Sequence, residues 1–148
     1  MTLIEFLIKA KTSTYADGIK YKVTSTKPNS IDYHYEEDSF IYHDTYFGSK
    51  EFYGEEIVYI DDSPIWHMEY KGGVLNDENT EIYAKVLKLA LKNVDNKFPL
   101  RGPKEFFIDD YKYTFETIGT FDQFEGIERI YKKDKLVYEL ICCGGEIL

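Results

Sequence analysis

Cysteine and long apolar runs are scarce in this chain of 148 residues. The two cysteines, Cys142 and Cys143, are adjacent, so in a strand they would point to opposite faces and an ordinary disulfide between them is not expected. No segment approaches the roughly 20 consecutive apolar residues of a membrane-spanning helix, and the N-terminus lacks the pattern of a secretion signal. We therefore expect a cytoplasmic protein that does not contact a membrane.

Positive charge is also in deficit. The chain has 18 lysine and arginine residues against 27 aspartate and glutamate residues, which gives a formal net charge of −9. Binding to nucleic acid requires clustered positive charge, because the protein must neutralise phosphates. We therefore expect no direct contact with nucleic acid.

Motifs of the common catalytic and metal sites are missing. The sequence has no Gly-x-Ser-x-Gly elbow, no phosphate loop, no dinucleotide fingerprint and no Cys/His nucleophile pair. The three histidines, His34, His43 and His67, do not have the spacing of metal ligands on one helix or strand face. We therefore name no catalytic residue, no metal site and no cofactor.

Aromatic residues, in contrast, are abundant. They make up 17% of the chain, with 14 tyrosines and 10 phenylalanines, and such side chains are typical of strands. The spacing of apolar residues predicts one helix from Thr2 to about Lys11 and a second from Thr80 to Asp95. Antiparallel strands are expected from Asp32 to Val74, and again from Pro103 to the C-terminus.

An internal repeat organises these segments. The sequence from Phe52 to Gly73 reappears 72 residues later, from Phe124 to Gly145, with seven identities in 22 ungapped positions. Upstream of it the offset is 71. We therefore predict a single domain, residues 1–148, in which about 1–76 and 77–148 are copies of one unit.

The predicted fold class is α+β. Each copy would be an α-β-β-β-β unit, and a pseudo-twofold axis would relate the two. The antiparallel strands would form one sheet or two closely packed sheets, with the helices packed on one side.

Hairpin turns set the expected faces of the strands. A two-residue turn at Asp62-Ser63 pairs Tyr59 with Trp66 on a core face, and the equivalent turn at Asp134-Lys135 pairs Tyr131 with Tyr138. This register places Glu56 and Glu128 on the other face, among Phe52, Val58, Phe124 and Ile130. Two interpretations follow. The glutamates are solvated or bonded to neighbouring backbone, or they form a cation-receptive cleft between the halves.

The cleft hypothesis names seven candidate ligand-binding residues. Aromatic side chains would shape the pocket and charged ones would select the ligand. Arg101 lies in the rigid Arg101-Gly102-Pro103 connector, where it would meet the carboxylates or a bound anion, or form a plain linker salt bridge. The candidates are Tyr46, Glu56, Trp66, Tyr70, Arg101, Glu128 and Tyr138.

Several segments together resemble a bacterial domain family of unknown function. The most specific are Tyr46-Phe47-Gly48, Pro64-Ile65-Trp66 and Arg101-Gly102-Pro103, within a similarity that covers nearly the whole chain. Members occur alone or fused behind an XRE-type helix-turn-helix. The resemblance implies a sensor or effector-binding module, with DNA binding in a separate domain, and it supplies no catalytic residues.

The leading functional hypothesis is a non-enzymatic module that binds a cationic or aromatic small molecule between the two halves. One alternative is a small hydrolase or isomerase that uses Asp44, His43 or the glutamates for acid/base chemistry. Another is a protein-interaction domain, whose acidic surface would meet a basic partner and whose free sheet edges would pair. The chain is expected to be a monomer or a homodimer.

Overall fold

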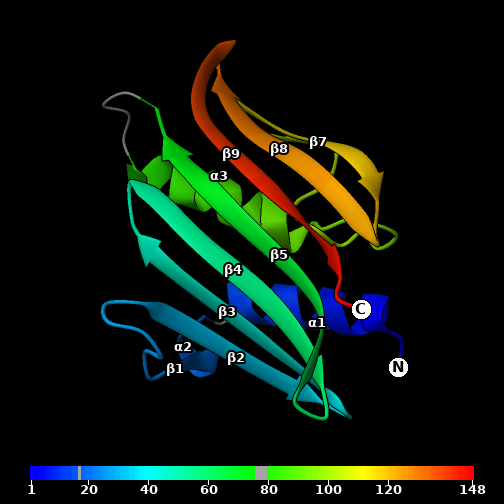
Figure 1. Cartoon of the computed structure of the whole chain (residues 1–148). Coiled ribbons are helices and arrows are strands. Elements are labelled where there is room, and N and C mark those ends of the chain that lie inside the picture. Colours follow the sequence, from blue (N-terminus) through cyan, green and yellow to red (C-terminus); the bar gives the residue numbers. More distant parts are fainter. Residues whose placement is uncertain (17, 76–79) are drawn as a thin grey trace.

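Nine strands and three helices make up the described part of the chain, which covers residues 1–16, 18–75 and 80–148 of a computed structural model (Figure 1). The helices are α1 (Leu3–Ala16), α2 (Gly18–Tyr21) and α3 (Thr80–Lys92). The strands are β1 (Lys22–Val23), β2 (Ile31–Glu37), β3 (Phe40–Gly48), β4 (Glu51–Ile60), β5 (Ser63–Val74), β6 (Glu105–Ile108), β7 (Tyr111–Thr120), β8 (Gln123–Lys132) and β9 (Lys135–Glu146).

All nine strands belong to one antiparallel sheet. Their order is β1-β2-β3-β4-β5-β9-β8-β7-β6, so two consecutive runs of strands meet at the pairing of β5 with β9 (Figure 1). That pairing extends over nine residue pairs, from Trp66 opposite Glu146 to Val74 opposite Tyr138. The question of one sheet or two is thereby decided in favour of one.

The expected α+β fold class is wrong. The strands hold more than twice as many residues as the helices, and the protein is predominantly β. The reason is that β4, β5, β8 and β9 run for 10 to 12 residues each and join the halves into a single sheet. The helices α1 and α3 contact each other and add side chains to the core of this sheet, and they do not form a layer comparable with it.

The helix positions differ from the sequence-based expectations mainly in length. Helix α1 continues to Ala16, well beyond the predicted end at Lys11, and α3 ends at Lys92, before the predicted Asp95. The predicted boundary between the halves, near residue 76, lies outside the described residues.

The predicted hairpin register is also wrong, by one residue on β4 and on β8. The β4–β5 turn is formed by Asp61 and Asp62, which both have positive φ (48° and 63°), as a type I′ turn requires. A β-bulge then follows between Val58 and Tyr59, so that Val58, and not Tyr59, faces Trp66. Because side chains alternate along a strand, this slip transfers Glu56 from the expected outer face to the buried one.

The second hairpin departs from the prediction in the same way. Its turn is formed by Lys133 and Asp134, with φ of 46° and 65°, and a bulge lies between Ile130 and Tyr131. Ile130 therefore pairs with Tyr138, and Glu128 lies on the buried face.

One buried cluster contains side chains from both long helices and from both runs of strands. Phe6, Leu7 and Ala10 of α1 and Val86 and Ala90 of α3 belong to it. Its strand members include the fully buried Tyr42, Val58, Trp66, Met68, Tyr113, Ile130, Tyr138 and Leu140. Burial of such side chains contributes about 1.5–3 kcal/mol each to folding, so this cluster is the main source of stability.

Candidate functional site

Glu128 is the centre of a buried polar cluster. Its carboxylate accepts two hydrogen bonds from Arg101, from Nη2 at 2.8 Å and from Nε at 3.1 Å. The hydroxyls of Tyr138, at 2.6 Å, and Tyr113 also donate to it. Arg101 is 3% exposed and Glu128 fully buried, so the ion pair is shielded from water. Every oxygen of this carboxylate is satisfied, as a buried charge requires.

Glu56 forms the corresponding ion pair in the first half. Its Oε2 accepts a hydrogen bond from Nζ of Lys11, which also donates to the Leu100 carbonyl at 2.8 Å. This pair is less complete, however. In the described part of the chain, Oε1 of Glu56 and the hydroxyl of Tyr42 are buried without a hydrogen-bond partner.

A substitution between the halves explains the unsatisfied oxygen. Trp66 stands 72 residues before Tyr138, and each lies on the strand that pairs with a glutamate-bearing strand. Tyr138 donates to its glutamate, whereas the indole Nε1 of Trp66 points to the carbonyl of Phe121, at 3.4 Å. The tryptophan therefore leaves Oε1 of Glu56 without the donor that its counterpart has.

Asp44 lies beside Glu56. The two residues are directly opposite each other on β3 and β4. Tyr70 donates a hydrogen bond from its hydroxyl to Oδ1 of Asp44, at 2.7 Å. The ring of Tyr70 can cross β4 because Gly54 has no side chain: a Cβ there would lie 2.4 Å from the Tyr70 hydroxyl oxygen. The absence of a side chain at Gly54 thus lets the Tyr70 hydroxyl, from β5, reach the Asp44 carboxyl on β3.

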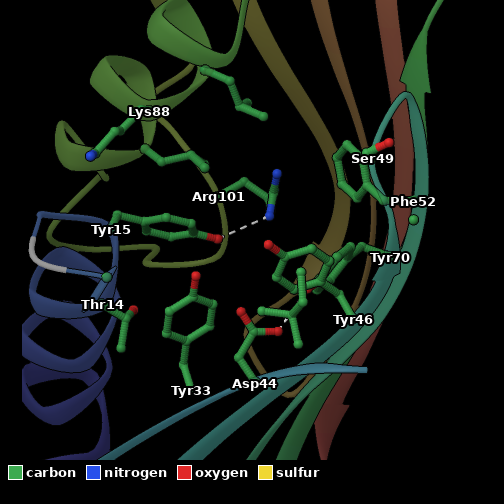
Figure 2. Close-up of a pocket in the computed structure, with 15 residues that line it drawn as sticks. Thr14, Tyr15, Tyr33, Asp44, Tyr46, Ser49, Phe52, Tyr70, Lys88 and Arg101 are labelled. Carbon is green, nitrogen blue, oxygen red and sulfur yellow. Dashed lines mark hydrogen bonds between the residues drawn. The ribbon is translucent and has the colours of Figure 1, made fainter. Parts of the chain in front are cut away.

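A cavity of about 440 Å³ opens above Asp44, between the sheet and the helices (Figure 2). Its wall carries four tyrosine side chains, one carboxyl and one guanidinium. Ile31, Phe52, Leu87 and Leu91 supply apolar surface. The polar members are Tyr15, Tyr33, Tyr46, Tyr70, Asp44 and Arg101, together with Thr14, Ser49 and Lys88. An apolar pocket with a few convergent polar groups is typical of small-molecule sites.

The polar groups that line this cavity contact one another. Arg101 donates from Nη1 to the Tyr15 hydroxyl at 3.3 Å, and its guanidinium lies 5.3 Å from the centre of the Tyr70 ring (Figure 2). The rings of Tyr33 and Tyr46 are stacked, with centroids 6.3 Å apart. Burial raises the pKa of Tyr15, Tyr46 and Tyr70, so these phenols keep their protons and can donate hydrogen bonds.

The Asp44 carboxyl is only 5% exposed. Burial, together with the negative charge of Glu56, raises its pKa to about 7. Near neutral pH this carboxyl therefore changes between a protonated form, which can donate a hydrogen bond, and an anion.

The structure brings three of the seven predicted residues to the cavity wall, namely Tyr46, Tyr70 and Arg101. The other four, Glu56, Trp66, Glu128 and Tyr138, are fully buried and are not among its lining residues. The expected face for the two glutamates is wrong because of the register slip described above. Both interpretations of them are incorrect in detail, since each carboxylate pairs with a buried cation and neither is solvated nor on a cleft wall.

Sequence reasoning missed Tyr15 and Tyr33 as wall residues, and it considered Asp44, like His43 and the glutamates, for acid/base catalysis and not for ligand binding. The structure places Asp44 and His43 on opposite faces of β3, and His43 pairs with Asp32, at 2.7 Å between Nε2 and Oδ2. The alternation of side chains along a strand already predicts opposite faces for these two neighbours. No sequence pattern joined Tyr15 of α1 to the strands.

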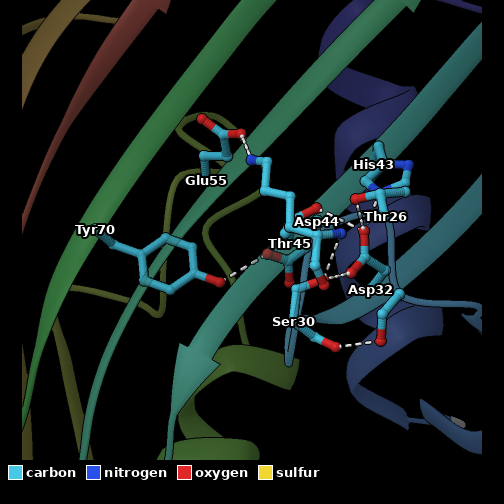
Figure 3. A network of polar contacts seen from close by, with 10 residues as sticks. Thr26, Ser30, Asp32, His43, Asp44, Thr45, Glu55 and Tyr70 are labelled. Atoms are coloured by element: carbon cyan, nitrogen blue, oxygen red, sulfur yellow. Dashed lines mark hydrogen bonds and ion pairs between the residues drawn. The ribbon is translucent and has the colours of Figure 1, made fainter.

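Asp32 is the centre of a second polar network, on the other face of β3 (Figure 3). It is fully buried and accepts hydrogen bonds from Ser30, from Thr26 at 2.6 Å and from Thr45 at 2.9 Å. Burial alone would raise the pKa of Asp32, but these hydrogen bonds hold it well below its usual range. The network ties the segment before β2 to the sheet.

We expect an Asp32→Asn variant to be less stable than the parent by about 2–3 kcal/mol at neutral pH, because an amide cannot accept all of these hydrogen bonds. The folded-state pKa is depressed, so the stabilisation is present above the unfolded-state pKa and is lost as the pH falls through the folded-state value. Urea unfolding of both proteins at several pH values measures this. A stability difference that stays constant down to strongly acidic pH would contradict it.

The outer face of the sheet carries a second hollow, of about 570 Å³, lined in part by Tyr53, Ile118, Ile127 and Ile141. Of these, Ile118 is 76% exposed and Ile141 57%.

Among the described residues there is no group of three or more histidine, cysteine, aspartate or glutamate side chains placed to hold a metal ion. No helix in the described part of the chain is long and apolar enough to cross a membrane.

The fold and the site define a class: a protein built on one antiparallel sheet, with a tyrosine-lined cavity beneath its helices. The family model called "Domain of unknown function (DUF5680)" matches residues 44–147, and the chain belongs to this family. The match includes Asp44, Tyr46, Tyr70 and Arg101 of the cavity, and it begins after Tyr15 and Tyr33. No curated protein and no solved structure matches the chain.

Proposed function

We propose that this protein is a small-molecule-binding module, and that the ligand occupies the cavity between the helices and the first half of the sheet. The observation that carries the proposal is the convergence of the Asp44 carboxyl, four tyrosine side chains and Arg101 on one cavity whose wall also has apolar surface. Groups of this kind fix the orientation of a ligand, while apolar surface provides affinity.

The fixed position of these groups supports a binding role. Arg101 is held by Glu128, and Tyr70 is held by Asp44 through the gap at Gly54. The wall is therefore organised before a ligand arrives, which lowers the entropic cost of binding.

A role in sensing is the finer part of the proposal. The bacterial family that the sequence resembles includes chains fused behind an XRE-type helix-turn-helix. In such an arrangement a cytoplasmic binding module would report the ligand to a DNA-binding domain elsewhere. The cavity is partly built from α1 and from the connector after α3, so ligand binding would link the two halves of the chain.

Plugging the cavity tests this function. Ser49 is exposed at the cavity wall, and Ser49→Trp should fill the opening without disturbing the core. Compounds that raise the melting temperature of the parent in a screen of small aromatic amines, alcohols and acids should lose this effect in the variant. The matched control is Ser39→Trp, at an exposed turn that does not line the cavity. Hits that survive in Ser49→Trp, or the absence of any hit, would contradict the proposal.

A further inference from the structure

Buried charges on the cavity side of the sheet do not balance. The carboxylates are Asp44, Glu56 and Glu128, and the cations are Lys11 and Arg101; none of the five is more than 5% exposed. Glu56 is paired with Lys11, and Glu128 with Arg101. Among the described residues, no buried cation is left for Asp44, which has only the Tyr70 hydroxyl as a side-chain hydrogen-bond partner. Lys88, on the cavity wall, is exposed to solvent.

A further positive charge, in addition to Lys11 and Arg101, is therefore needed whenever Asp44 is ionised. A carboxylate shielded from water is unfavourable unless a positive charge compensates it. Oε1 of Glu56, on the neighbouring strand, is a buried acceptor without a hydrogen-bond partner in the described part of the chain, so it adds no donor that could compensate Asp44. The compensating charge can be a proton on Asp44 or a cation supplied from the cavity.

We propose that the ligand is an organic cation, an aromatic or similarly compact amine, whose ammonium group lies against Asp44. This inference rests on the proposed small-molecule function of the same cavity. The tyrosine rings of the wall suit such a ligand in two ways. Their faces attract a cation, and their apolar surface accommodates the carbon skeleton in a cavity of about 440 Å³.

The second half of the chain shows that the fold does not need this carboxyl. Phe115 lies opposite Glu128 as Asp44 lies opposite Glu56. Similarly, Cys142 lies opposite Gly126 as Tyr70 lies opposite Gly54. The second half thus also buries a glutamate ion pair. It has the Phe115 ring in place of the Asp44 carboxyl, and the Cys142 thiol in place of the Tyr70 phenol. At these two positions, the polar groups belong to the half that lines the cavity.

Ligand and proton should compete for Asp44. Burial raises the pKa of Tyr15, Tyr42, Tyr46 and Tyr70, so these neighbouring phenols keep their protons near neutral pH. The charged and titratable groups that face it are Lys11 and Tyr15 from α1, Tyr33 from β2, Tyr42 and Tyr46 from β3, Glu56 from β4, Tyr70 from β5, Lys88 from α3 and Arg101 from the connector. Amine binding should therefore weaken below neutral pH, by up to about tenfold per pH unit.

Matched pairs of probes test the inference. We would use tyramine with 4-(2-hydroxyethyl)phenol, benzylamine with benzyl alcohol, and phenethylamine with 2-phenylethanol, because each pair differs in the charged group alone. Titration calorimetry at about pH 8 should give at least one amine that binds about tenfold or more tightly than its alcohol. At about pH 5.5 that amine should bind more than about tenfold more weakly, with release of a proton on binding.

Two variants complete the experiment. Asp44→Asn should lose both the preference for the amine and the pH dependence, whereas Glu69→Gln, an exposed carboxylate on the outer face of β5, should keep both. Thermal unfolding confirms that each variant is folded. If alcohols bind as tightly as amines at both pH values and Ser49→Trp abolishes their binding, the cation inference fails and the small-molecule function stands. If no probe binds at millimolar concentration, both fail.

Discussion

Arg101→Met is expected to destabilise the protein by about 3–5 kcal/mol. The variant removes the cation that donates two hydrogen bonds to Glu128 and leaves a fully buried carboxylate with tyrosine partners only. Methionine has a similar length and fills most of the space, so the loss reports the charge and not a cavity. Guanidinium chloride unfolding, followed by far-ultraviolet circular dichroism, measures the difference.

Arg129→Met is the matched control. Arg129 also bonds a glutamate, Glu139, at 2.8 Å, but their side chains are 26% and 40% exposed. An exposed ion pair contributes little, so this variant should lose less than about 1 kcal/mol. Combining Arg101→Met with Glu128→Gln should recover part of the stability, since the unpaired charge is then gone. Equal losses of unfolding free energy for Arg101→Met and Arg129→Met would show that burial does not strengthen the effect of losing the Arg101–Glu128 pair.

The second large effect is a gain in stability. Asp44→Asn should unfold at higher denaturant concentration than the parent at about pH 8, by an amount equivalent to about 2–4 kcal/mol. An amide still accepts the hydrogen bond from Tyr70 and carries no charge that needs a partner. Such a trade of stability for a binding site is common in functional proteins.

The sign of the pH dependence follows from the raised pKa of Asp44, about 7 in the fold against an ordinary 3.8. The contribution of protonated Asp44 to the free energy of unfolding is fully present below the unfolded-state pKa. It is lost as the pH rises through the folded-state pKa. The advantage of Asp44→Asn over the parent should therefore grow from about pH 4 to about pH 7 and then level off. A variant less stable than the parent at about pH 8 would contradict the charge imbalance.

The sequence predicted the elements of the fold better than their arrangement. Apolar spacing located both long helices, and aromatic runs located the strands. The fold class was wrong because no local pattern showed that β5 and β9 pair along nine residues and join all strands into one sheet.

The faces of the strands failed for a different reason. Two adjacent aspartates can both adopt positive φ, so the turn moved to Asp61-Asp62, and a bulge followed at Val58 and Tyr59. Neither feature leaves a clear mark in the sequence. With the correct register, the alternation of β4 would have placed Glu56 in the core, opposite Asp44.

The candidate site was accessible from the sequence only in part. Tyr46, Tyr70 and Arg101 were named because they are aromatic or charged residues near the repeat, and the structure places them at the cavity. Asp44 is important because it is the buried carboxylate without a paired cation among the described residues, and this follows only from the tertiary structure. Its counterpart, Phe115, was visible in the repeat, and a comparison of the two halves for lost and gained polar groups could have found it.

The most direct measurement of the central claim is the titration of the Asp44 carboxyl itself. Carbon-detected NMR of the protein labelled at aspartate side chains, with Asp44→Asn for assignment, follows this group across the pH range. We predict a midpoint at about 7 in the free protein, and a shift to lower pH when an amine from the probe series is bound. A midpoint near the ordinary value of 3.8 would show that Asp44 is ionised without a partner and would contradict the account.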